Sequence, residues 1–277
     1  MAGDQVDKAR RFQALHRRPG AFVIPNPWDA GSARLLEQLG FEALATTSAG
    51  FAFSIGRPDG PGPTSRDEML AHAESIVAAT ALPVSADLEN CFGNAPEVVA
   101  ETIRRAGAAG LVGASVEDTT GDARRPIHEF GLAVERVAAA ADAARQLPFP
   151  FTLTARTENF LHGRPDLDDT IRRLQAFDKA GADVLYAPGL PSLDAIHAVC
   201  AAVTKPVNVI AGMRLFTVAE LAEAGVKRIS VGSLLSRAAY GAFLRAAREV
   251  KEHGTFTFAQ DAVPFAEINA MMASARR

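Results

Sequence analysis

Short apolar runs alternate with longer amphipathic segments from one end of the chain to the other. The apolar runs are Ala21–Pro25, Ala43–Thr46, Pro83–Ser85, Leu111–Val116, Phe149–Ala155, Val184–Tyr186, Val207–Ile210 and Arg228–Val231. Continuous apolar runs of this length are typical of parallel strands that are buried on both faces of a sheet. The pattern therefore predicts eight parallel strands.

The amphipathic segments between these runs predict helices. Asp29–Gln38 has apolar side chains at helical spacing and ends beside Gly40, while Pro96–Ala106 starts with a proline and is expected to stop at Gly107. The other predicted helices are Arg66–Thr80, Leu132–Gln146, Leu167–Ala180, Leu193–Ala202, Val218–Ala224 and Leu234–His253. Eight strand–helix pairs without a linker predict an α/β protein in which residues 1–277 form one (β/α)8 TIM barrel. An open doubly wound sheet is the alternative.

A tail, Thr255–Arg277, follows the last predicted helix. Its apolar residues are Phe256, Phe258, Val263, Phe265, Ile268 and Met271. Because a monomer has little use for so apolar an extension, we expect residues 255–277 to be an oligomerisation tail that packs on a neighbouring subunit.

Composition excludes several classes of protein. The net charge of −3 gives no electrostatic basis for binding nucleic acid, and no run approaches the roughly 18 apolar residues of a membrane span. Two cysteines, Cys91 and Cys200, do not form a disulfide framework. The charged N-terminus does not look like a signal peptide. We therefore expect a soluble cytoplasmic protein with a small-molecule substrate.

Polar residues gather where the predicted strands end. In a (β/α)8 barrel these ends and the loops after them carry the chemistry. The residues in these positions are Asn26, Trp28, Asp29, Thr46, Thr47, Ser48, Ser85, Asp87, Glu89, Glu117, Asp118, Arg156, Glu158 and Asn208. The sequence thus predicts a polar site at one mouth of the barrel.

Three acids from neighbouring strands form the candidate metal site. Asp87 and Glu89 alternate with apolar residues, so both point inward if the strand continues, and Glu117 follows the next strand. Clustered carboxylates need a cation or a proton to neutralise them. Oxygen ligands favour Mg²⁺ or Mn²⁺, and no set of Cys and His offers a zinc site. Alternatively, each acid caps a helix or pairs with an arginine.

Arg156 is the candidate for holding an anionic substrate, because a guanidinium binds a carboxylate or phosphonate as a bidentate fork. A salt bridge to Glu117 or Glu158 is the alternative. Small residues that include Thr47 and Ser48 can present amide and hydroxyl groups to an anion. Trp28 either lines the pocket or packs beneath it.

No lysine is predicted at this mouth of the barrel in a position to react with a carbonyl substrate. Lys205 and Lys227 precede their strands and belong on the opposite face of the barrel. This placement argues against an aldolase that forms a Schiff base with its substrate.

Several short motifs follow one another along the chain: Asn26–Asp29, Gly40–Leu44, Thr46–Gly50, Gly56–Asp59, Ser85–Asp87, Phe92–Gly93, Val116–Asp118, Ala155–Glu158 and Asn208. In this order they resemble the isocitrate lyase/phosphoenolpyruvate mutase superfamily. It implies chemistry in which a C–C or P–C bond is cleaved or formed beside a metal-bound 2-oxo acid. It also implies a homo-oligomer, a dimer or tetramer, whose subunits exchange a C-terminal helix.

The resemblance also implies roles for individual residues. Thr47 and Ser48 match the loop that binds the carboxylate or phosphonate end of the substrate. Asp59 matches an acid on a mobile loop near the metal, and Asp87 and Glu117 match acids that hold Mg²⁺, partly through water. Arg156 matches the arginine that clamps the substrate. Asn208 matches a polar residue on the far wall, and we add Ser85 and Trp28 as candidates for substrate binding.

Three departures from the family pattern narrow the function. Ser85 stands where the first acid of the strand pair is usual, and Glu89 is a possible replacement. The Lys-Lys-Cys-Gly motif of the lyase branch is absent: residues 119–125 read Thr-Thr-Gly-Asp-Ala-Arg-Arg. The resemblance therefore does not support isocitrate or methylisocitrate lyase activity. The asparagine-bearing gate loop of the phosphonate mutases is not evident either.

The leading hypothesis is a Mg²⁺-dependent lyase or hydrolase, phosphonomutase-like, that acts on an oxaloacetate-like or phosphonopyruvate-like 2-oxo acid. One alternative is a metal-free barrel enzyme that binds phosphate at Gly232 and Ser233. The other is a non-catalytic protein that binds 2-oxo acids.

Overall fold

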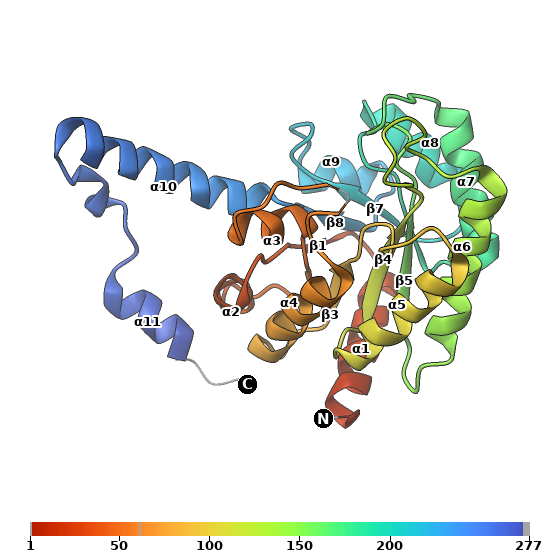
Figure 1. The fold of residues 1–277 in the computed structure, drawn as a ribbon, viewed down its shortest axis with the longest axis horizontal. Helices are drawn as coiled ribbons and strands as arrows, with labels where there is room; N and C mark the ends of the chain where they lie inside the picture. Colours follow the sequence, from red (N-terminus) through yellow and green to blue (C-terminus); the bar gives the residue numbers. More distant parts are fainter. Residues whose placement is uncertain (1, 61, 274–277) are drawn as a thin grey trace.

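Eight parallel strands make up the sheet of the computed structural model, which describes residues 2–60 and 62–273 (Figure 1). The strands are β1 (Phe22–Ile24), β2 (Leu44–Ala45), β3 (Val84–Asp87), β4 (Gly113–Glu117), β5 (Thr152–Arg156), β6 (Val184–Tyr186), β7 (Val207–Ile210) and β8 (Arg228–Ser230). Their order in the sheet is β1-β8-β7-β6-β5-β4-β3-β2.

The two ends of this sheet, β1 and β2, meet through hydrogen bonds. The Ala45 amide donates to the carbonyl of Pro25 at 3.1 Å, and the Asn26 side-chain amide donates to the carbonyl of Thr46 at 2.9 Å. The sheet therefore closes into a cylinder. The predicted (β/α)8 barrel is confirmed, and the alternative of an open doubly wound sheet is wrong.

Helices lie close to where the sequence predicts them, and all of the following except α10 surround the cylinder. They are α2 (Ala30–Gln38), α4 (Arg66–Ala79), α5 (Pro96–Ala108), α6 (Phe130–Arg145), α7 (Leu167–Ala180), α8 (Leu193–Ala202), α9 (Val218–Glu223) and α10 (Leu234–His253). The expected stop of α5 at Gly107 is wrong, because the helix continues to Ala108. Gly107 lies where a β-carbon would come within 2.8 Å of Leu147, so a side chain there would clash. The turn into β4 uses Gly110 instead, with φ of +88°.

An N-terminal helix, α1 (Ala2–Arg17), was not predicted. Its Phe12 is fully buried and packs in one cluster with Phe22, Ile24 and Val112. The Gln5 side chain donates to the carbonyls of Gly107 and Leu111, both of which precede β4. The helix therefore lies under the N-terminal ends of the strands and forms the floor of the barrel.

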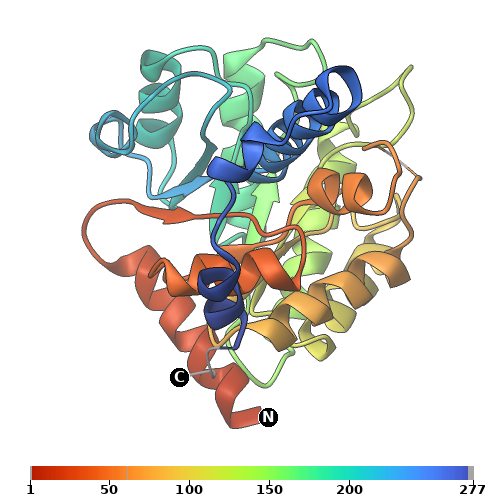
Figure 2. The same cartoon turned by 90° about the vertical axis from the view of Figure 1, so that its left-hand side faces the viewer.

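The C-terminal part of the chain departs from the compact barrel. Helix α10 projects outward as an arm, and the chain then turns back through a short 3-10 helix (Thr257–Gln260) to α11 (Phe265–Ala273), as Figures 1 and 2 show. Helix α11 lies against α2 of the same chain, where Arg34 donates to the carbonyl of Met272. The described part of the predicted oligomerisation tail thus contacts its own barrel; residues 274–277 of that tail lie outside the described residues.

No helix in the described part of the chain is long and apolar enough to cross a membrane.

His16 of α1 gives stability a dependence on pH. Burial and the neighbouring Arg228 lower the pKa of His16 to about 3, so the ring is neutral in the folded protein. In the unfolded chain the pKa of His16 is near 6.5. Between that pH and the folded-state pKa, the unfolded state binds a proton at His16 and the folded state does not. The stability of the fold therefore falls as pH falls. We expect His16→Gln, which keeps an acceptor without titrating, to lose about 2 kcal/mol less stability than the wild type between pH 7 and pH 5. Urea unfolding at both pH values measures this; equal losses would contradict it.

Candidate active site

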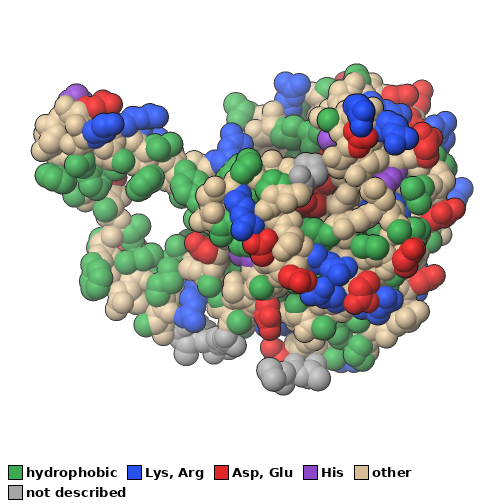
Figure 3. Space-filling model, in the orientation of Figure 1, with side chains coloured by type: hydrophobic (Ala, Val, Ile, Leu, Met, Phe, Trp, Pro, Cys, Tyr) green, Lys and Arg blue, Asp and Glu red, His purple; other side chains and the backbone are tan. Residues whose placement is uncertain are grey.

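A cavity of about 660 Å³ opens at the C-terminal ends of the strands. Most of the predicted site residues line it: Thr47, Ser48, Asp59, Ser85, Asp87, Glu89, Glu117, Arg156 and Asn208. The closed cylinder explains this convergence, because it brings the ends of all eight strands to one rim. Figure 3 shows acidic side chains at the hollow in this face.

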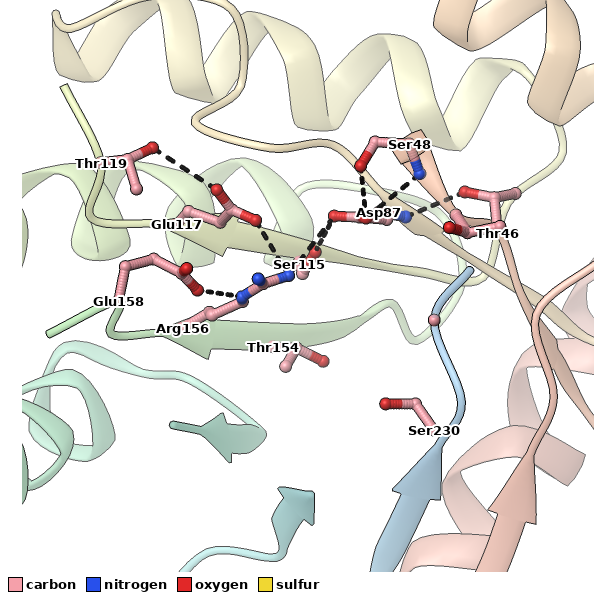
Figure 4. Close-up of polar contacts among 12 residues, drawn as sticks. Thr46, Ser48, Asp87, Ser115, Glu117, Thr119, Thr154, Arg156, Glu158 and Ser230 are labelled. Carbon is pink, nitrogen blue, oxygen red and sulfur yellow. Dashed lines mark hydrogen bonds and ion pairs between the residues drawn. The ribbon is translucent and has the colours of Figure 1, made fainter. Parts of the chain in front are cut away.

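Arg156 stands at the centre of the rim, between acids from three segments (Figure 4). It ends β5, where it lies in register with Glu117 on β4. Its Nη1 is 2.9 Å from Oε1 of Glu117 and 3.9 Å from Oδ1 of Asp87, and its Nε donates to Oε1 of Glu158. Its guanidinium also lies over the ring of Tyr186, 4.8 Å from the centroid. The salt bridges to Glu117 and Glu158 that were the alternative are both present. The binding of an anionic substrate by Arg156 stays a prediction.

The charges in this group do not balance. Three carboxylates, those of Asp87, Glu117 and Glu158, surround one guanidinium, so the ionised group has a formal charge of −2. Burial raises the pKa of Glu117 well above its ordinary value, and attraction to Arg156 offsets this only in part. Burial would lower the pKa of Arg156, but Glu117 and Glu158 outweigh it and raise that pKa. The site therefore requires protons or a cation to neutralise it.

Hydroxyl groups hold Asp87 in place. One of its carboxylate oxygens accepts hydrogen bonds from the hydroxyl of Ser48 at 2.9 Å and from the Ser48 amide at 3.3 Å. Its own amide donates to the Thr46 hydroxyl at 3.0 Å. The other carboxylate oxygen accepts a long hydrogen bond, 3.4 Å, from Ser115 on β4. Asp87 is thus oriented toward the cavity by three neutral donors around the rim.

Glu89 reaches the cavity by a different path from the predicted one. Strand β3 ends at Asp87, and Glu89 has a φ of +50°, so the expected continuation of the extended strand is wrong. The fully buried Leu88 lies between the two acids. Burial and the charges of Asp87 and Asp59 raise the pKa of Glu89 to about 8.

Asp59 and the run after β2 form the other side of the rim. Asp59 lies on the segment between α3 (Ser48–Ser54) and α4, and partial desolvation together with Asp87 raises its pKa. The run of small residues after β2 forms the start of α3, a helix that was not predicted from the sequence. The Thr47 hydroxyl caps this helix by accepting from the Gly50 amide at 3.2 Å.

Trp28 does not line the cavity. It packs behind α3, where its β-carbon lies 3.0 Å from the point that a β-carbon on Gly50 would occupy. Its carbonyl pairs with Nε2 of His72 at 2.9 Å. Of the two predictions for Trp28, packing beneath the pocket agrees with this position, and lining the pocket does not.

Asp118 is a buried residue that holds the turn after β5 in place through hydrogen bonds. It is buried, and it accepts hydrogen bonds from the Glu158 amide at 2.9 Å and the Thr157 hydroxyl at 3.0 Å. Arg173 on α7 pairs with it at 3.2 Å. These contacts fix the turn that carries Glu158 toward Arg156.

The donor set suits a hard divalent cation that carries its own water. In the described part of the chain, no three His, Cys, Asp or Glu side chains are arranged as a ready metal cage. However, the groups around Asp87 are carboxylates and hydroxyls, and the charge of −2 matches one divalent ion. Mg²⁺ commonly binds through only one or two carboxylates and keeps several waters. The residues present therefore fit Mg²⁺.

Sequence reasoning missed the residues deeper in the cavity. Ser115, Thr154, Tyr186, Arg228 and Ser230 line it on β4, β5, β6 and β8. Thr154 and Ser115 each lie two positions before a predicted rim residue on the same strand. Because side chains alternate along a strand, this spacing was the available signal.

The family model described as phosphoenolpyruvate phosphomutase matches residues 12–251 of this chain. The chain belongs to this family. It is therefore an enzyme of the phosphoenolpyruvate mutase/isocitrate lyase superfamily, whose members include lyases, hydrolases and mutases.

Two relatives with named activities cover much of the chain. The 2-methylisocitrate lyase of Shewanella oneidensis is 33% identical, over 88% of this chain and 85% of its own length. The oxaloacetate decarboxylase of Bradyrhizobium diazoefficiens is 30% identical, over 72% of this chain and 69% of its own.

Solved structures share the fold over nearly the full length. A Burkholderia cenocepacia protein, described as a lyase/mutase, is 62% identical and has a TM-score of 0.96, covering 99% of this chain and 98% of its own. An oxaloacetate acetylhydrolase in complex with its product oxalate is 26% identical and has a TM-score of 0.86, covering 96% of this chain and 93% of its own.

Replacing Arg156 should make stability depend on pH in a defined direction. In Arg156→Gln the buried acids lose their cation, so they keep protons in the folded state to a higher pH than in the unfolded state. The folded state then binds more protons, and stability must fall as pH rises. We expect the variant to be destabilised by about 3 kcal/mol at pH 8, and by clearly less at pH 6. Urea unfolding of both proteins at the two pH values measures the difference; a constant difference would count against the charge balance described above.

Proposed function

We propose that this enzyme is a Mg²⁺-dependent lyase or hydrolase that cleaves a C–C or P–C bond in a small 2-oxo acid of the oxaloacetate or phosphonopyruvate type. The observation that carries the proposal is the position of Arg156 at the cavity mouth, among carboxylates whose charge it does not balance. Such a site has room for both a divalent cation and an anionic substrate.

Asp87, Glu117 and Glu89 would hold the ion, and Ser85 would offer a hydroxyl on the same strand as Asp87. When bound, Mg²⁺ supplies a Lewis acid beside the 2-oxo group of the substrate. Asp87 is already oriented toward the cavity by Ser48, so little rearrangement is needed to present an oxygen.

Arg156 is the proposed catalytic residue. Its guanidinium binds the substrate's oxo-carboxylate end, and its charge stabilises the oxygen on which negative charge develops. In decarboxylation of oxaloacetate the C3–C4 bond breaks, CO2 leaves, the bond electrons move toward the 2-oxo oxygen, and the resulting enolate takes a proton at C3 to give pyruvate. In hydrolysis to oxalate and acetate, water adds at C2, the C2–C3 bond breaks, and the acetate fragment takes the electrons and a proton. Thr47 holds the carboxylate, whereas Ser48, predicted for the same role, donates its hydroxyl and amide to Asp87. The segment with Asp59 closes the rim.

The named relatives support a 2-oxo acid substrate. Oxaloacetate is the substrate named for the Bradyrhizobium relative and for the acetylhydrolase structure. Transfer of the 2-methylisocitrate lyase activity is opposed by residues 119–125, which contain no cysteine or lysine. We therefore place this chain nearer to the oxaloacetate-processing relatives.

Phosphate binding at the end of β8 is less well supported. The amides of Val231 and Gly232 both donate to the side-chain oxygen of Asn26 at 2.9 Å. The Gly232 amide is therefore engaged within the barrel, which weighs against the metal-free alternative.

Oxaloacetate turnover tests the proposed activity. We expect purified enzyme with Mg²⁺ to release pyruvate, or oxalate and acetate, and we expect EDTA to abolish the release. Asp87→Asn should lower kcat/KM at least about 100-fold, because the ion loses its charged ligand. Glu97→Gln, an exposed acid on α5, is the matched control and should behave as the wild type. Turnover that persists in EDTA contradicts the metal role, and tight binding of oxaloacetate without turnover supports the non-catalytic alternative.

We also propose that the enzyme is a homo-oligomer in which α10 packs against a second copy. The arm stands away from the barrel in Figures 1 and 3, and its apolar side chains remain exposed. Phe243 is 65% exposed on α10, and Phe256 and Phe265 beyond it are 64% and 83% exposed. A surface of this kind usually marks a protein interface.

A charge placed on the arm tests this assembly. We expect light scattering to give a dimer or tetramer for the wild type and a smaller species for Phe243→Glu, because the charge would be buried without a partner. Leu215→Glu is the matched control, since Leu215 is 97% exposed in the segment between β7 and α9. A wild-type monomer, or an unchanged mass for Phe243→Glu, would overturn the proposal.

A further inference from the structure

Arg228 lies inside the barrel, below the rim. It begins β8, in register with Asn208 on β7, and only 5% of its surface is exposed. Its Nε donates to the Asn208 side-chain oxygen at 2.8 Å, and its Nη2 donates to the Thr154 hydroxyl at 2.9 Å. Its Nη1 lies 3.4 Å from Nε2 of His16, which rises from the floor helix α1.

All three partners of Arg228 are neutral. Asn208 and Thr154 carry no charge, and His16 is uncharged at neutral pH because its pKa is lowered to about 3. Among the described residues no carboxylate lies within 4.0 Å of the guanidinium. Burial lowers the pKa of Arg228 to about 10, which still leaves it protonated at neutral pH. A buried cation without a counter-ion is costly, so an anion is expected to join it.

The cavity gives such an anion a route. Arg228, Asn208 and Thr154 line the same cavity whose mouth holds Arg156, and Tyr186 and Ser230 line the wall between. A guanidinium has five N–H groups, and the three contacts above account for three of them. In the part of the chain that the structure describes, this leaves one N–H on each terminal nitrogen for the planar carboxylate that a guanidinium fork binds well.

Arg228 and Arg156 lie at different depths of the same cavity. Thr154, which bonds Arg228, precedes Arg156 by two residues on β5 and faces the same side. At about 3.3 Å per residue, the α-carbons of Thr154 and Arg156 are about 7 Å apart along β5. A ligand that is bound at Arg156 and carries a second anionic group on its chain would extend toward this lower level.

We propose that Arg228, held by Asn208 and Thr154, forms a second anion subsite, which binds the distal carboxylate of a 2-oxo dicarboxylic acid. This inference rests on the proposed function, because it assumes that the oxo end of the substrate lies at Arg156. It assigns the substrate class as dicarboxylic and makes Arg228 the residue that selects it.

A matched pair of ligands tests the subsite. 2-Oxoglutarate and 2-oxopentanoate have the same chain length, and they differ only in whether the far end is a carboxylate or a methyl group. In calorimetric titrations with Mg²⁺, we expect the wild type to bind 2-oxoglutarate at least about tenfold more tightly. Arg228→Gln should bring the two affinities within about twofold, while Arg228→Lys, which keeps the charge, should retain part of the preference.

Oxalate, which is too short to reach the floor, separates this inference from the proposed function. Its Mg²⁺-dependent binding should be the same in the wild type and in Arg228→Gln. If oxalate does not bind the wild type, the upper site and the proposed function fail. If oxalate binds but the wild type shows no preference for 2-oxoglutarate, the subsite alone is refuted.

An equal loss of oxalate and 2-oxoglutarate binding in Arg228→Gln would show that Arg228 is only structural. Should that variant not fold, Thr154→Val provides a second test, because it removes one support and keeps the cation. It should weaken 2-oxoglutarate several-fold and leave 2-oxopentanoate unchanged; equal effects on both would overturn the subsite.

Discussion

The unbalanced charge around Arg156 is the constraint on which the rest of the site depends. Glu117 reaches Arg156 because β4 and β5 are in register, and Glu158 reaches it because Asp118 and Arg173 fix the turn after β5. One guanidinium cannot neutralise three carboxylates. The barrel tolerates this arrangement only if protons or a cation supply positive charge, and the proposed divalent metal is such a cation.

Much of the fold and the rim was predictable from the sequence, for physical reasons. Buried parallel strands read as continuous apolar runs, and closure of the barrel brings their ends together, so residues such as Asp87 and Arg156 could be assigned to one mouth without coordinates. Trp28 could not be placed, because an aromatic side chain beside a pocket suits the wall and the packing beneath it equally well. Glu89 reaches the cavity because its backbone is in the left-handed region, a conformation that the residue types around it do not predict.

The floor of the barrel was the part least visible in the sequence. Helix α1 is rich in charged residues, and its buried Phe12 is one of few apolar positions, so its packing role was hidden. Arg228 begins an apolar strand and was counted only as part of that run. Its position next to His16 and Thr154 depends on which residues share a level inside the cylinder, and that level is set by the stagger of the strands, not by spacing along the chain.

The position of α1 also determines which face of the protein points into solution when its N-terminal end is attached to a surface. The chain enters beneath the barrel, at the end opposite the cavity, and the N-terminus lies there in Figures 1 and 2. A protein anchored to a surface by this end would hold its mouth toward the surrounding solution, with the α10 arm extending sideways. Immobilised preparations should then keep the cavity within reach of small molecules.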